Sequence, residues 1–356
     1  MHVAMIVGAR PQFIKLAPLS AVLGKKHRVD IIHTGQHYDY EMSQSFFSQL
    51  KIPEPDINLN VGSGSQGRQT GRMLIAVERT LLERKPDLVL VFGDTNSTLA
   101  GALAARKLNL AIGHIEAGLR SYNRVMPEEI NRLLTDHVSD FLFCPTPTAV
   151  RNLNAEGIGV PASQRVFLVG DVMFDALLAA RGKALRLSRS LLCRHGLARG
   201  RYFLLTLHRA ENTDYPDTLR RIFIALSSLA CPVLFPVHPR TEKIIGRFRI
   251  RVGKNIRIIP PASYLEMLCL EANSLKILTD SGGVQKEAYL LGVPCVTLRT
   301  ETEWVETVHD GWNIVSGTEG ENIIRSIERP SPDRPRRPVF GDGRASEKIA
   351  AIIDAL

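Results

Sequence analysis

The sequence predicts an α/β protein made of two Rossmann-like, doubly wound domains with a cleft between them. Short, continuously apolar runs alternate with amphipathic helical patterns along almost the whole chain, and the alternation occurs in two series. Continuous apolar strands joined by helical crossovers are typical of parallel sheets that are covered on both faces. The chain has 356 residues, of which 44% are hydrophobic, so it is long enough to build two cores.

Each series can be given residue ranges. In the first, the runs that predict buried strands are 2–7, 29–34, 87–93, 110–115, 140–144 and 166–169. In the second, they are 202–207, 231–237, 255–259, 275–279 and 293–298. Helical patterns lie between them, including 97–107, 128–138, 217–229, 263–272 and 283–291. We therefore expect an N-terminal domain over 1–170 and a C-terminal domain over 171–343, with an amphipathic helix at 344–356 that packs back on the first domain.

Charge and hydropathy bear on the possible partners. The net charge is +9, so nucleic-acid binding must be considered. The excess is spread over 181–201 and 329–337 without interleaved aromatic residues, which favours solvated surface and an anionic small-molecule substrate over nucleic acid. No apolar run reaches the ~20 residues that span a bilayer, and the apolar run 2–7 leads into a Gly-Ala-Arg-Pro turn, as a strand does. We expect no membrane association and a cytoplasmic location.

The cysteines predict neither disulfides nor a metal site. There are five of them, widely spaced and mostly inside apolar runs: Cys144, Cys193, Cys231, Cys269 and Cys295. An odd number without the spacing of a zinc site is typical of buried free thiols.

Polar residues follow the strands predicted in the first half. Open parallel sheets bind their ligands beyond the carboxyl ends of the strands, so these residues are the first candidates for a site. Arg10 lies in the turn after the first strand and Lys15 in the following helix, while Asp94 and Glu116 follow two successive strands and Glu128 opens the next helix. A purely structural interpretation makes Asp94 an N-cap and Glu128 a partner of a helix dipole. Three acids at one edge would instead shift one another's pKa and act as acid and base.

The second half places cationic groups and glycines in the equivalent positions. His208 and Arg209 follow the strand 202–207, and Arg299 follows 293–298. The stretch "TDSGGVQKEA" ends a strand and opens a helix, and contains Ser281, Gly282, Gly283 and Glu287. Glycines at this junction would let an anion, typically a phosphate, approach the helix N-terminus. The alternative is a tight turn with Ser281 as an N-cap.

Seven motifs together resemble one family. They are "GARPQFIK", "TGQHYDYEM", "GDTNSTLAGALAA", "HIEAGLRS", "MPEEINR", "HRAEN" and "TDSGGVQKEA". In this order they resemble the non-hydrolysing UDP-N-acetylglucosamine 2-epimerases, from residue 3 to about residue 349. The resemblance implies a glycosyltransferase-B-type architecture, a homodimer, and interconversion of UDP-GlcNAc and UDP-ManNAc. It also implies that no cofactor is needed, which agrees with the lack of a G-x-G-x-x-G fingerprint after the first strand.

The resemblance assigns roles to the candidate residues. The implied reaction eliminates UDP to give a 2-acetamidoglucal and then adds UDP back after a proton returns to the opposite face of C2. The catalytic residues would be Asp94, Glu116, Glu128 and His208, with no assignment of acid to face. The substrate-binding residues would be Arg10, Lys15, Arg209, Ser281, Gly282, Gly283, Glu287 and Arg299, with Glu287 on the ribose. Tyr264 lies either near uracil or in the core.

The chain departs from the best-known bacterial members in two places. Its loop from Arg120 to Glu128 is two residues shorter, as in relatives that act on UDP-2,3-diacetamido-glucuronate, and Arg124 there could pair with a uronate carboxylate. That sugar is therefore the alternative substrate. The segment "TGQHYDYEM" replaces a more basic one that helps those relatives bind a second, activating UDP-GlcNAc. Gln36, His37 and Arg68 would be the remnants of such a site.

Three other classes of protein remain as alternatives. A retaining glycosyltransferase shares the fold and the UDP site, but it needs an acceptor and has no use for three acids. A nucleic-acid-binding protein would need a tight basic patch, and its affinity would fall steeply with salt. A regulatory sensor of nucleotide sugars requires the acids to be dispensable.

Overall fold

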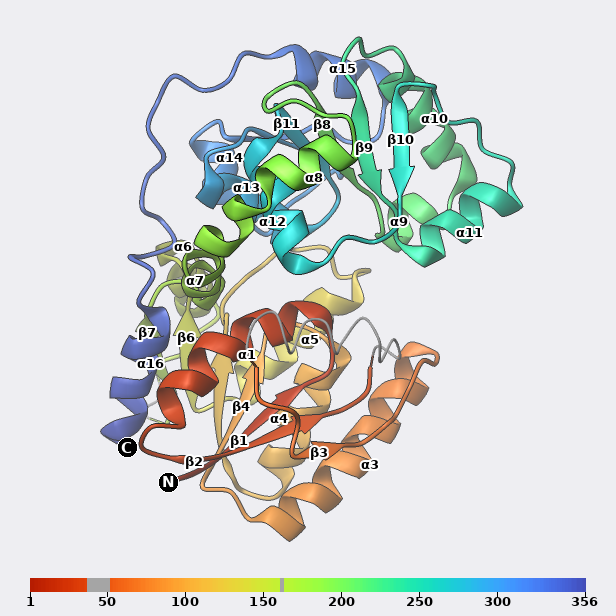
Figure 1. Ribbon diagram of the computed structural model, residues 1–356. Coiled ribbons are helices and arrows are strands. Elements are labelled where there is room, and N and C mark those ends of the chain that lie inside the picture. The colour runs from red at the N-terminus through yellow and green to blue at the C-terminus, as the bar shows by residue number, and fades with distance from the viewer. Residues whose placement is uncertain (37–51, 161–162) are drawn as a thin grey trace. The chain divides into compact units, whose positions relative to one another are not determined.

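The computed structural model describes residues 1–36, 52–160 and 163–356, and its chain forms two compact units (Figure 1). Unit 1 consists of Met1–Ala179 together with Pro338–Leu356, and unit 2 of Ala180–Arg337. The sequence had placed these boundaries at 170/171 and 343/344. The first difference arises because the helix that follows residue 170 begins in unit 1, where its Val172 joins the hydrophobic core.

Unit 1 is built on a seven-stranded parallel sheet. Its strand order is β3-β2-β1-β4-β5-β6-β7. The strands are β1 His2–Val7, β2 Arg28–His33, β3 Ile57–Asn58, β4 Leu88–Phe92, β5 Ala111–Ile115, β6 Phe141–Cys144 and β7 Arg165–Leu168. The order reverses between β1 and β4, whose register pairs Ala4 with Val89. Such a switch point is where doubly wound sheets bind ligands.

The helices of unit 1 cover both faces of this sheet. They are α1 Arg10–Leu23, α3 Gln66–Arg84, α4 Asn96–Lys107, α5 Pro127–Val138, α6 Pro147–Ala155 and α16 Ala345–Asp354, together with the first half of α7 Val172–Arg186, which continues into unit 2. One core cluster lies between the sheet, α1 and α16, and another lies between the sheet, α3 and α4. The central strands β1, β4 and β5 are buried on both faces, which is why they read as continuous apolar runs, whereas the edge strands β3 and β7 are partly exposed.

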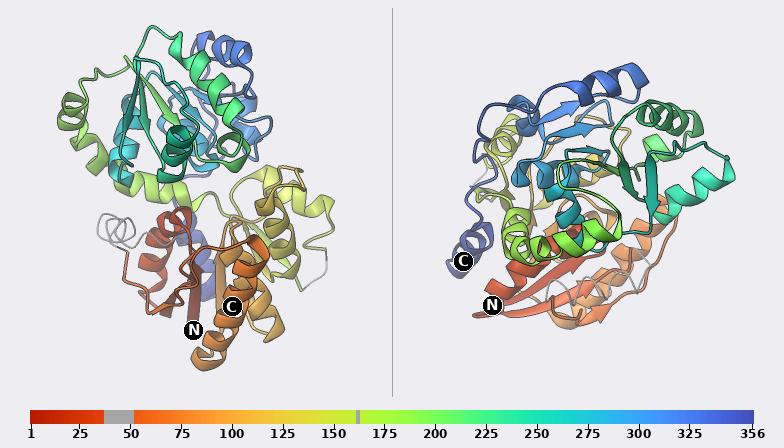
Figure 2. Two further views of the ribbon diagram at one scale, coloured as in Figure 1. Left: turned by 90° about the vertical axis from the view of Figure 1, so that its right-hand side faces the viewer. Right: turned by 45° about the horizontal axis from the view of Figure 1, so that its top comes forward.

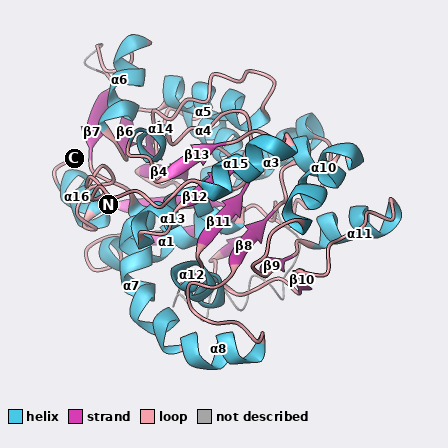
Figure 3. Cartoon of the chain, turned by 90° about the horizontal axis from the view of Figure 1, so that it is seen from above, coloured by secondary structure: helices cyan, strands magenta, loops and turns pink. Residues whose placement is uncertain are grey.

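Unit 2 has a six-stranded parallel sheet in the order β10-β9-β8-β11-β12-β13. The strands are β8 Phe203–Thr206, β9 Val233–Pro236, β10 Ile256–Ile259, β11 Lys276–Thr279, β12 Cys295–Thr297 and β13 Asn313–Val315. The helices are α8 Ser188–Arg194, α9 Ala210–Thr213, α10 Pro216–Ser227, α11 Pro239–Arg247, α12 Tyr264–Asn273, α13 Gly282–Leu291, α14 Val305–His309 and α15 Gly320–Glu328. Figure 3 shows α10 and α15 along one side of this row of strands and α8 and α12 along the other. The predicted pair of doubly wound domains is confirmed. The sequence missed β3 and β13, which have two and three residues.

The C-terminal helix α16 belongs to unit 1, and it lies near the N-terminus of the chain in Figure 2. Its Ile349 and Ile353 are buried in the cluster that contains Leu16 and Leu19 of α1. The Asp175 carboxylate accepts hydrogen bonds from the backbone N–H groups of Ala345 (3.1 Å) and Ser346 (2.7 Å). Apolar burial and a capping carboxylate therefore hold the end of the chain against α1.

Two further expectations concern the cysteines and the possibility of a membrane-spanning helix. All five cysteines are free, but Cys193 is exposed, because it lies on the solvent side of α8. Among the described residues, no helix is both long and apolar enough to cross a membrane.

Replacement of Ile353 by Ala should destabilise the protein by roughly 2–4 kcal/mol, because the change leaves a cavity where a fully packed side chain lay. The measurement is urea unfolding at equilibrium. The matched control is Ile75→Ala on α3, where the side chain is 70% exposed and the expected change is below about 0.5 kcal/mol. Equal losses in the two variants would show that α16 is not part of the core.

Candidate functional site

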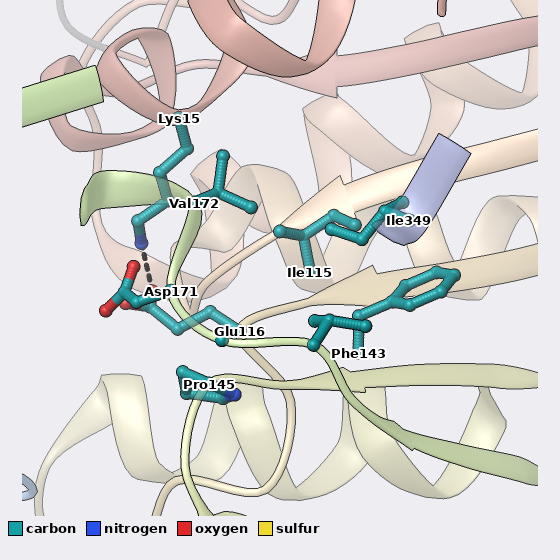
Figure 4. A pocket seen from close by; sticks show the side chains of 10 residues that line it. Lys15, Ile115, Glu116, Phe143, Pro145, Asp171, Val172 and Ile349 are labelled. Atoms are coloured by element: carbon teal, nitrogen blue, oxygen red, sulfur yellow. Dashed lines mark hydrogen bonds and ion pairs between the residues drawn. The ribbon is translucent and has the colours of Figure 1, made fainter. Parts of the chain in front are cut away.

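Glu116 and Lys15 form the centre of the carboxyl edge of unit 1. Glu116 follows β5 directly, and its backbone lies in the left-handed region, with φ of 73°. This conformation is costly for a residue that carries a Cβ. Its carboxylate forms an ion pair with the ammonium group of Lys15 from α1, and both side chains are more than 90% buried (Figure 4). The pair fixes the direction of a carboxylate that the sequence predicted to be catalytic.

Gly93 makes room for this pair. A Cβ on Gly93 would lie 3.2 Å from a Glu116 carboxylate oxygen and 3.4 Å from Lys15 Nζ, and the φ of Gly93 is +62°. A side chain here would therefore be strained and would crowd the pair. The small pocket in Figure 4 is lined by Lys15, Glu116, Phe143, Asp171, Val172 and Ile349, among others.

Asp94 is held by a buried arginine of α5. Arg132 donates to the Asp94 carboxylate and, at 2.8 Å, to Glu129. Asn131 donates to the backbone carbonyl of Asp94 (2.9 Å). The interpretation of Asp94 as an N-cap is wrong, because α4 begins one residue later and Thr95 caps it through its hydroxyl group. Asp94 thus stays partly exposed, with 30% of its side chain accessible.

The two adjacent glutamates of α5 differ in their surroundings. Glu129 is 1% exposed, and its carboxylate accepts hydrogen bonds from the backbone N–H groups of Ser121 and Tyr122, each at 2.9 Å. It therefore shapes the loop that precedes the helix. Glu128 lies in the first turn and is half-buried.

A buried network lies behind these loops. His114 of β5 has no exposed surface, and its ring nitrogens lie 2.7 Å from the carbonyl oxygen of Gly93 and 2.7 Å from the carboxylate of Asp136. Arg120 donates to Asp136 (2.6 Å) and forms a bidentate pair with Glu156 at 2.7 Å. Burial alone would raise the pKa of Asp136, but the charges and hydrogen bonds of His114 and Arg120 outweigh burial and lower it.

Gln12 organises the turn after β1. Its side-chain oxygen accepts hydrogen bonds from the backbone N–H groups of Gly8 (2.7 Å) and Ala9 (2.9 Å), and its amide donates to the carbonyl of Phe92 (2.7 Å). Gln12 thereby ties the turn that carries Arg10, the first residue of α1, to the end of β4. The sequence motif "GARPQFIK" contained Gln12 without revealing this role, because the partner lies 80 residues away.

The segment that the sequence linked to activation is described only in part. The side-chain oxygen of Gln36 accepts hydrogen bonds from the backbone N–H (3.2 Å) and the hydroxyl group (2.7 Å) of Ser97. Arg68 is exposed in the first turn of α3. His37 lies outside the described residues.

In unit 2, the buried Asp280 shapes the turn after β8. Its carboxylate accepts the backbone N–H groups of His208 and Arg209 at 3.0 Å and the side-chain amide of Asn212 at 3.1 Å. His208 Nδ1 lies 3.5 Å from the same carboxylate, and 41% of the His208 side chain is exposed. The sequence named His208 and Arg209 but missed Asp280, although it stands in the "TDSGG" motif. An aspartate directly after a strand was the available signal.

The N-terminus of α13 has the close approach that its glycines suggested. A Cβ on Gly282 would lie 2.2 Å from a carboxylate oxygen of Glu303, so only glycine fits there. Ser281 holds the N-cap position, but its side chain makes no capping hydrogen bond. The first N–H groups of the helix, beginning near Gly283, are therefore not taken by Ser281. Glu287 follows one turn later on α13 and is 5% exposed.

Arg299, which the sequence predicted to bind substrate, is surrounded by glutamates. Its side chain has no exposed surface, and its guanidinium lies 3.0 Å from the carboxylates of Glu211 and Glu303. Burial raises the pKa of Glu211, an effect that Arg299 partly offsets. The role of Arg299 toward a substrate stays a prediction. Tyr264 at the start of α12 is 3% exposed, which places it in the core of unit 2.

The net positive charge of the chain comes entirely from unit 2. This unit contains 25 of the 45 Lys and Arg residues and 16 of the 36 Asp and Glu residues, whereas unit 1 has 20 of each. Both basic stretches, 181–201 and 329–337, belong to unit 2. The unit that presents His208, Arg209 and the α13 N-terminus is therefore the one whose overall field attracts an anion.

The fold is that of an α/β protein with two doubly wound units: strand-end carboxylates gather in unit 1, and unit 2 has a histidine, an arginine and a glycine-rich helix start at the ends of its strands. A model of the family described as UDP-N-acetylglucosamine 2-epimerase matches residues 22–354. A Methanococcus maripaludis protein described as a UDP-N-acetylglucosamine 2-epimerase homolog is 53% identical over 99% of both chains. The UDP-2,3-diacetamido-2,3-dideoxy-D-glucuronate 2-epimerase of Pseudomonas aeruginosa is 47% identical over the full length of both chains.

A solved structure is also similar. The crystal structure of Methanocaldococcus jannaschii UDP-GlcNAc 2-epimerase in complex with UDP-GlcNAc and UDP matches over the whole of both chains, with a TM-score of 0.92 and 45% identity. The chain belongs to the UDP-N-acetylglucosamine 2-epimerase family, a family of isomerases. The resemblance seen in the motifs is thereby confirmed.

Replacement of Asp280 by Asn should weaken the binding of UDP about tenfold or more, because a buried acceptor of several N–H groups would become partly a donor and would displace His208 and Arg209. Isothermal titration with UDP measures this. The control is Asp217→Asn on α10, whose side chain is 82% exposed and whose replacement should leave affinity unchanged. Undiminished affinity in the Asp280 variant would show that the turn does not serve UDP.

Proposed function

We propose that the protein epimerises C2 of a UDP-linked N-acetylhexosamine, with UDP-GlcNAc and UDP-ManNAc as the substrate pair. The observation that carries the proposal is the buried Glu116–Lys15 pair, held in a costly backbone conformation at the carboxyl edge of a doubly wound sheet. A strained, buried carboxylate of this kind is typical of a functional residue. Family membership supports the same reaction class.

The proposed reaction follows from the chemistry of the sugar. The weakly acidic C2 proton leaves to a protein base while the C1–O bond to UDP breaks, which gives a 2-acetamidoglucal and UDP. The C1–O bond then forms again, and a proton is delivered to the opposite face of C2. An acid and a base on two faces are needed, and Glu116, Asp94 and Glu128 are the residues proposed for these roles. No external oxidant or reductant enters the balance.

The groups of unit 2 would bind the leaving UDP. A diphosphate gains from cationic side chains and from free N–H groups at a helix N-terminus. His208, Arg209, Ser281, Gly282 and Gly283 are proposed for this part, with Arg10 as a further phosphate ligand and Glu287 on the ribose. The homodimer and the cytoplasmic location remain predictions.

Proton NMR in D2O tests the reaction. With UDP-GlcNAc, the C2 proton signal should disappear while the signals of UDP-ManNAc grow, because the returning proton comes from solvent. Glu116→Gln should lower this rate by about 10²–10⁴-fold, the usual contribution of a general acid or base. Glu78→Gln on α3, an exposed acid of the same unit, should keep the wild-type rate. A spectrum that changes only when an acceptor is added would replace epimerisation with glycosyl transfer.

UDP-2,3-diacetamido-glucuronate is the second candidate substrate. The Pseudomonas aeruginosa relative named for this sugar is 47% identical over the full length. Arg124 lies exposed in the loop before α5, and it makes no ion pair within the residues that the structure describes. A guanidinium in this position could bind the uronate carboxylate that UDP-GlcNAc lacks.

Arg124→Ala distinguishes the two substrates. If the uronate is the substrate, the variant should raise its KM about 10-fold or more, through loss of a charge-assisted hydrogen bond, and leave the KM of UDP-GlcNAc unchanged. Steady-state kinetics with both sugars gives the comparison. Arg151→Ala on α6, another exposed arginine of unit 1, is the control. An unchanged KM for the uronate would remove Arg124 from recognition.

A further inference from the structure

Three elements that carry the proposed catalytic acids meet at one buried side chain, His114 of β5. One ring nitrogen lies 2.7 Å from the carbonyl oxygen of Gly93, the peptide that leads into Asp94. The other lies 2.7 Å from the carboxylate of Asp136, which is on α5, the helix whose first turn contains Glu128. His114 itself stands two residues before Glu116 on β5.

Hydrogen bonds from the same region also hold the loop after Glu116. The backbone N–H of Gly118 donates to Asp136 (3.2 Å), and its carbonyl accepts the side-chain amide of Asn152 (2.9 Å). A Cβ on Gly118 would lie 2.4 Å from the carbonyl oxygen of Ala149, and the φ of Gly118 is +82°. The close packing at Gly118 and these two hydrogen bonds therefore restrain the loop.

Both ring nitrogens of His114 face hydrogen-bond acceptors. A carbonyl oxygen can only accept, so the nitrogen beside Gly93 carries a proton. The other oxygen of Asp136 accepts from Arg120 at 2.6 Å, which is the arrangement of an ionised carboxylate, so the second nitrogen donates too. A neutral imidazole has a single N–H and cannot satisfy both partners.

The charges around the ring balance. His114 and Arg120 would supply two positive charges, and Asp136 and Glu156 two negative ones. Among the described residues, the Cys144 thiol of β6 also interacts with Asp136 and Arg120, and burial raises its pKa, so that it stays neutral. A buried charged group is tolerated when it is paired and fully hydrogen-bonded in this way.

We propose that His114 is a buried imidazolium that acts as a positioning residue for the acid–base chemistry: it braces the peptide before Asp94, the loop after Glu116 and the helix behind Glu128 in one fixed arrangement. The proposal deepens the proposed epimerase function and rests on it. His114 touches no substrate. Its effect is on the relative placement of three carboxylates, and catalytic groups lose much of their effect when they are displaced by about 1 Å.

Two substitutions at His114 each keep one of the two hydrogen bonds made by its ring. In His114→Gln the amide reaches as far as Nε2, so it can still donate to Gly93 but not to Asp136. In His114→Asn the amide sits where Nδ1 was, so it can still donate to Asp136 but not to Gly93. The matched control is Asp140→Asn, because Asp140 accepts from the Ile112 backbone (2.9 Å) and from Arg106 (2.6 Å) at the opposite, amino edge of the same strands.

The expected result separates kcat from KM and from UDP affinity. Both His114 variants should lower kcat about 10–100-fold while KM changes by less than about threefold. Their affinity for UDP, measured by titration, should be that of the wild type, because the proposed UDP ligands are chiefly in unit 2. Asp140→Asn should keep the wild-type kcat, even though it loses comparable hydrogen bonds. Wild-type kcat in either folded His114 variant overturns the proposal.

Nitrogen NMR of the wild-type protein labelled with ¹⁵N-histidine tests the charge independently of activity. One histidine, identified by its absence from the spectrum of a His114 variant or by its contacts to Gly93 and Gly118, should show both ring nitrogens protonated at pH 7. A single protonated nitrogen at pH 7 overturns the imidazolium. A wild type without epimerase activity that shows the doubly protonated ring would instead overturn the proposed function and leave the charge assignment supported.

Discussion

A fully buried aspartate controls the strand-end loops in each unit, and the functional groups of both units depend on it. Asp136 in unit 1 and Asp280 in unit 2 have no exposed surface, and each accepts hydrogen bonds from backbone N–H groups of loops that follow strands. A buried carboxylate is tolerated only when donors surround it. These hydrogen bonds restrain the loop that follows Glu116 in one unit and the turn that contains His208 in the other. Asp280 therefore supports the groups proposed to bind UDP in the same way as Asp136 supports the proposed acids.

The division of charge between the units fits two different chemical tasks. Unit 1 is neutral overall, and two of its three proposed acids are each fixed by a cation: Lys15 pairs with Glu116, and Arg132 pairs with Asp94. These contacts orient carboxylates without hiding them all, since Asp94 keeps part of its surface. Unit 2 carries the whole net charge and offers helix N–H groups. Proton transfer needs directed groups, whereas the binding of a diphosphate needs an attractive field.

Three residues with positive φ lie at the edge of the sheet where chemistry is proposed. Gly93 and Gly118 adopt positive φ on either side of Glu116, which adopts it as well. The hydrogen bonds of Gly118 with Asp136 and Asn152 stabilise this backbone conformation and offset part of its cost. In unit 2, glycine is required at position 282 for a steric reason, because the carboxylate of Glu303 occupies the space that a side chain would need. In both places the glycine is explained by a neighbour distant in sequence.

How much could be predicted from sequence depends on whether the cause is local. The strand runs, the two doubly wound domains and the polar residues after each strand follow from local hydrophobicity and from the rule that parallel strands align their carboxyl ends. The short strands β3 and β13 could not be predicted in this way, because two or three residues show no hydrophobic periodicity. The motifs named Asp94, Glu116, Glu128 and His208, but they could not show which of two adjacent glutamates accepts the backbone N–H groups of the preceding loop.

The sequence by itself determined the fold class, the family and the candidate residues, since each is written in contiguous stretches of residues. Only the tertiary structure decided the supporting contacts. The partner of Gln12 lies 80 residues away, that of Glu116 lies 101 away, and that of His208 lies 72 away. The surroundings of Arg299 were decided in the same manner, since Glu211, one of the glutamates that pair with it, lies on a separate helix far away in the sequence. Pairings across such separations depend on how the strands are ordered in the sheet, and that order is a property of the folded chain as a whole.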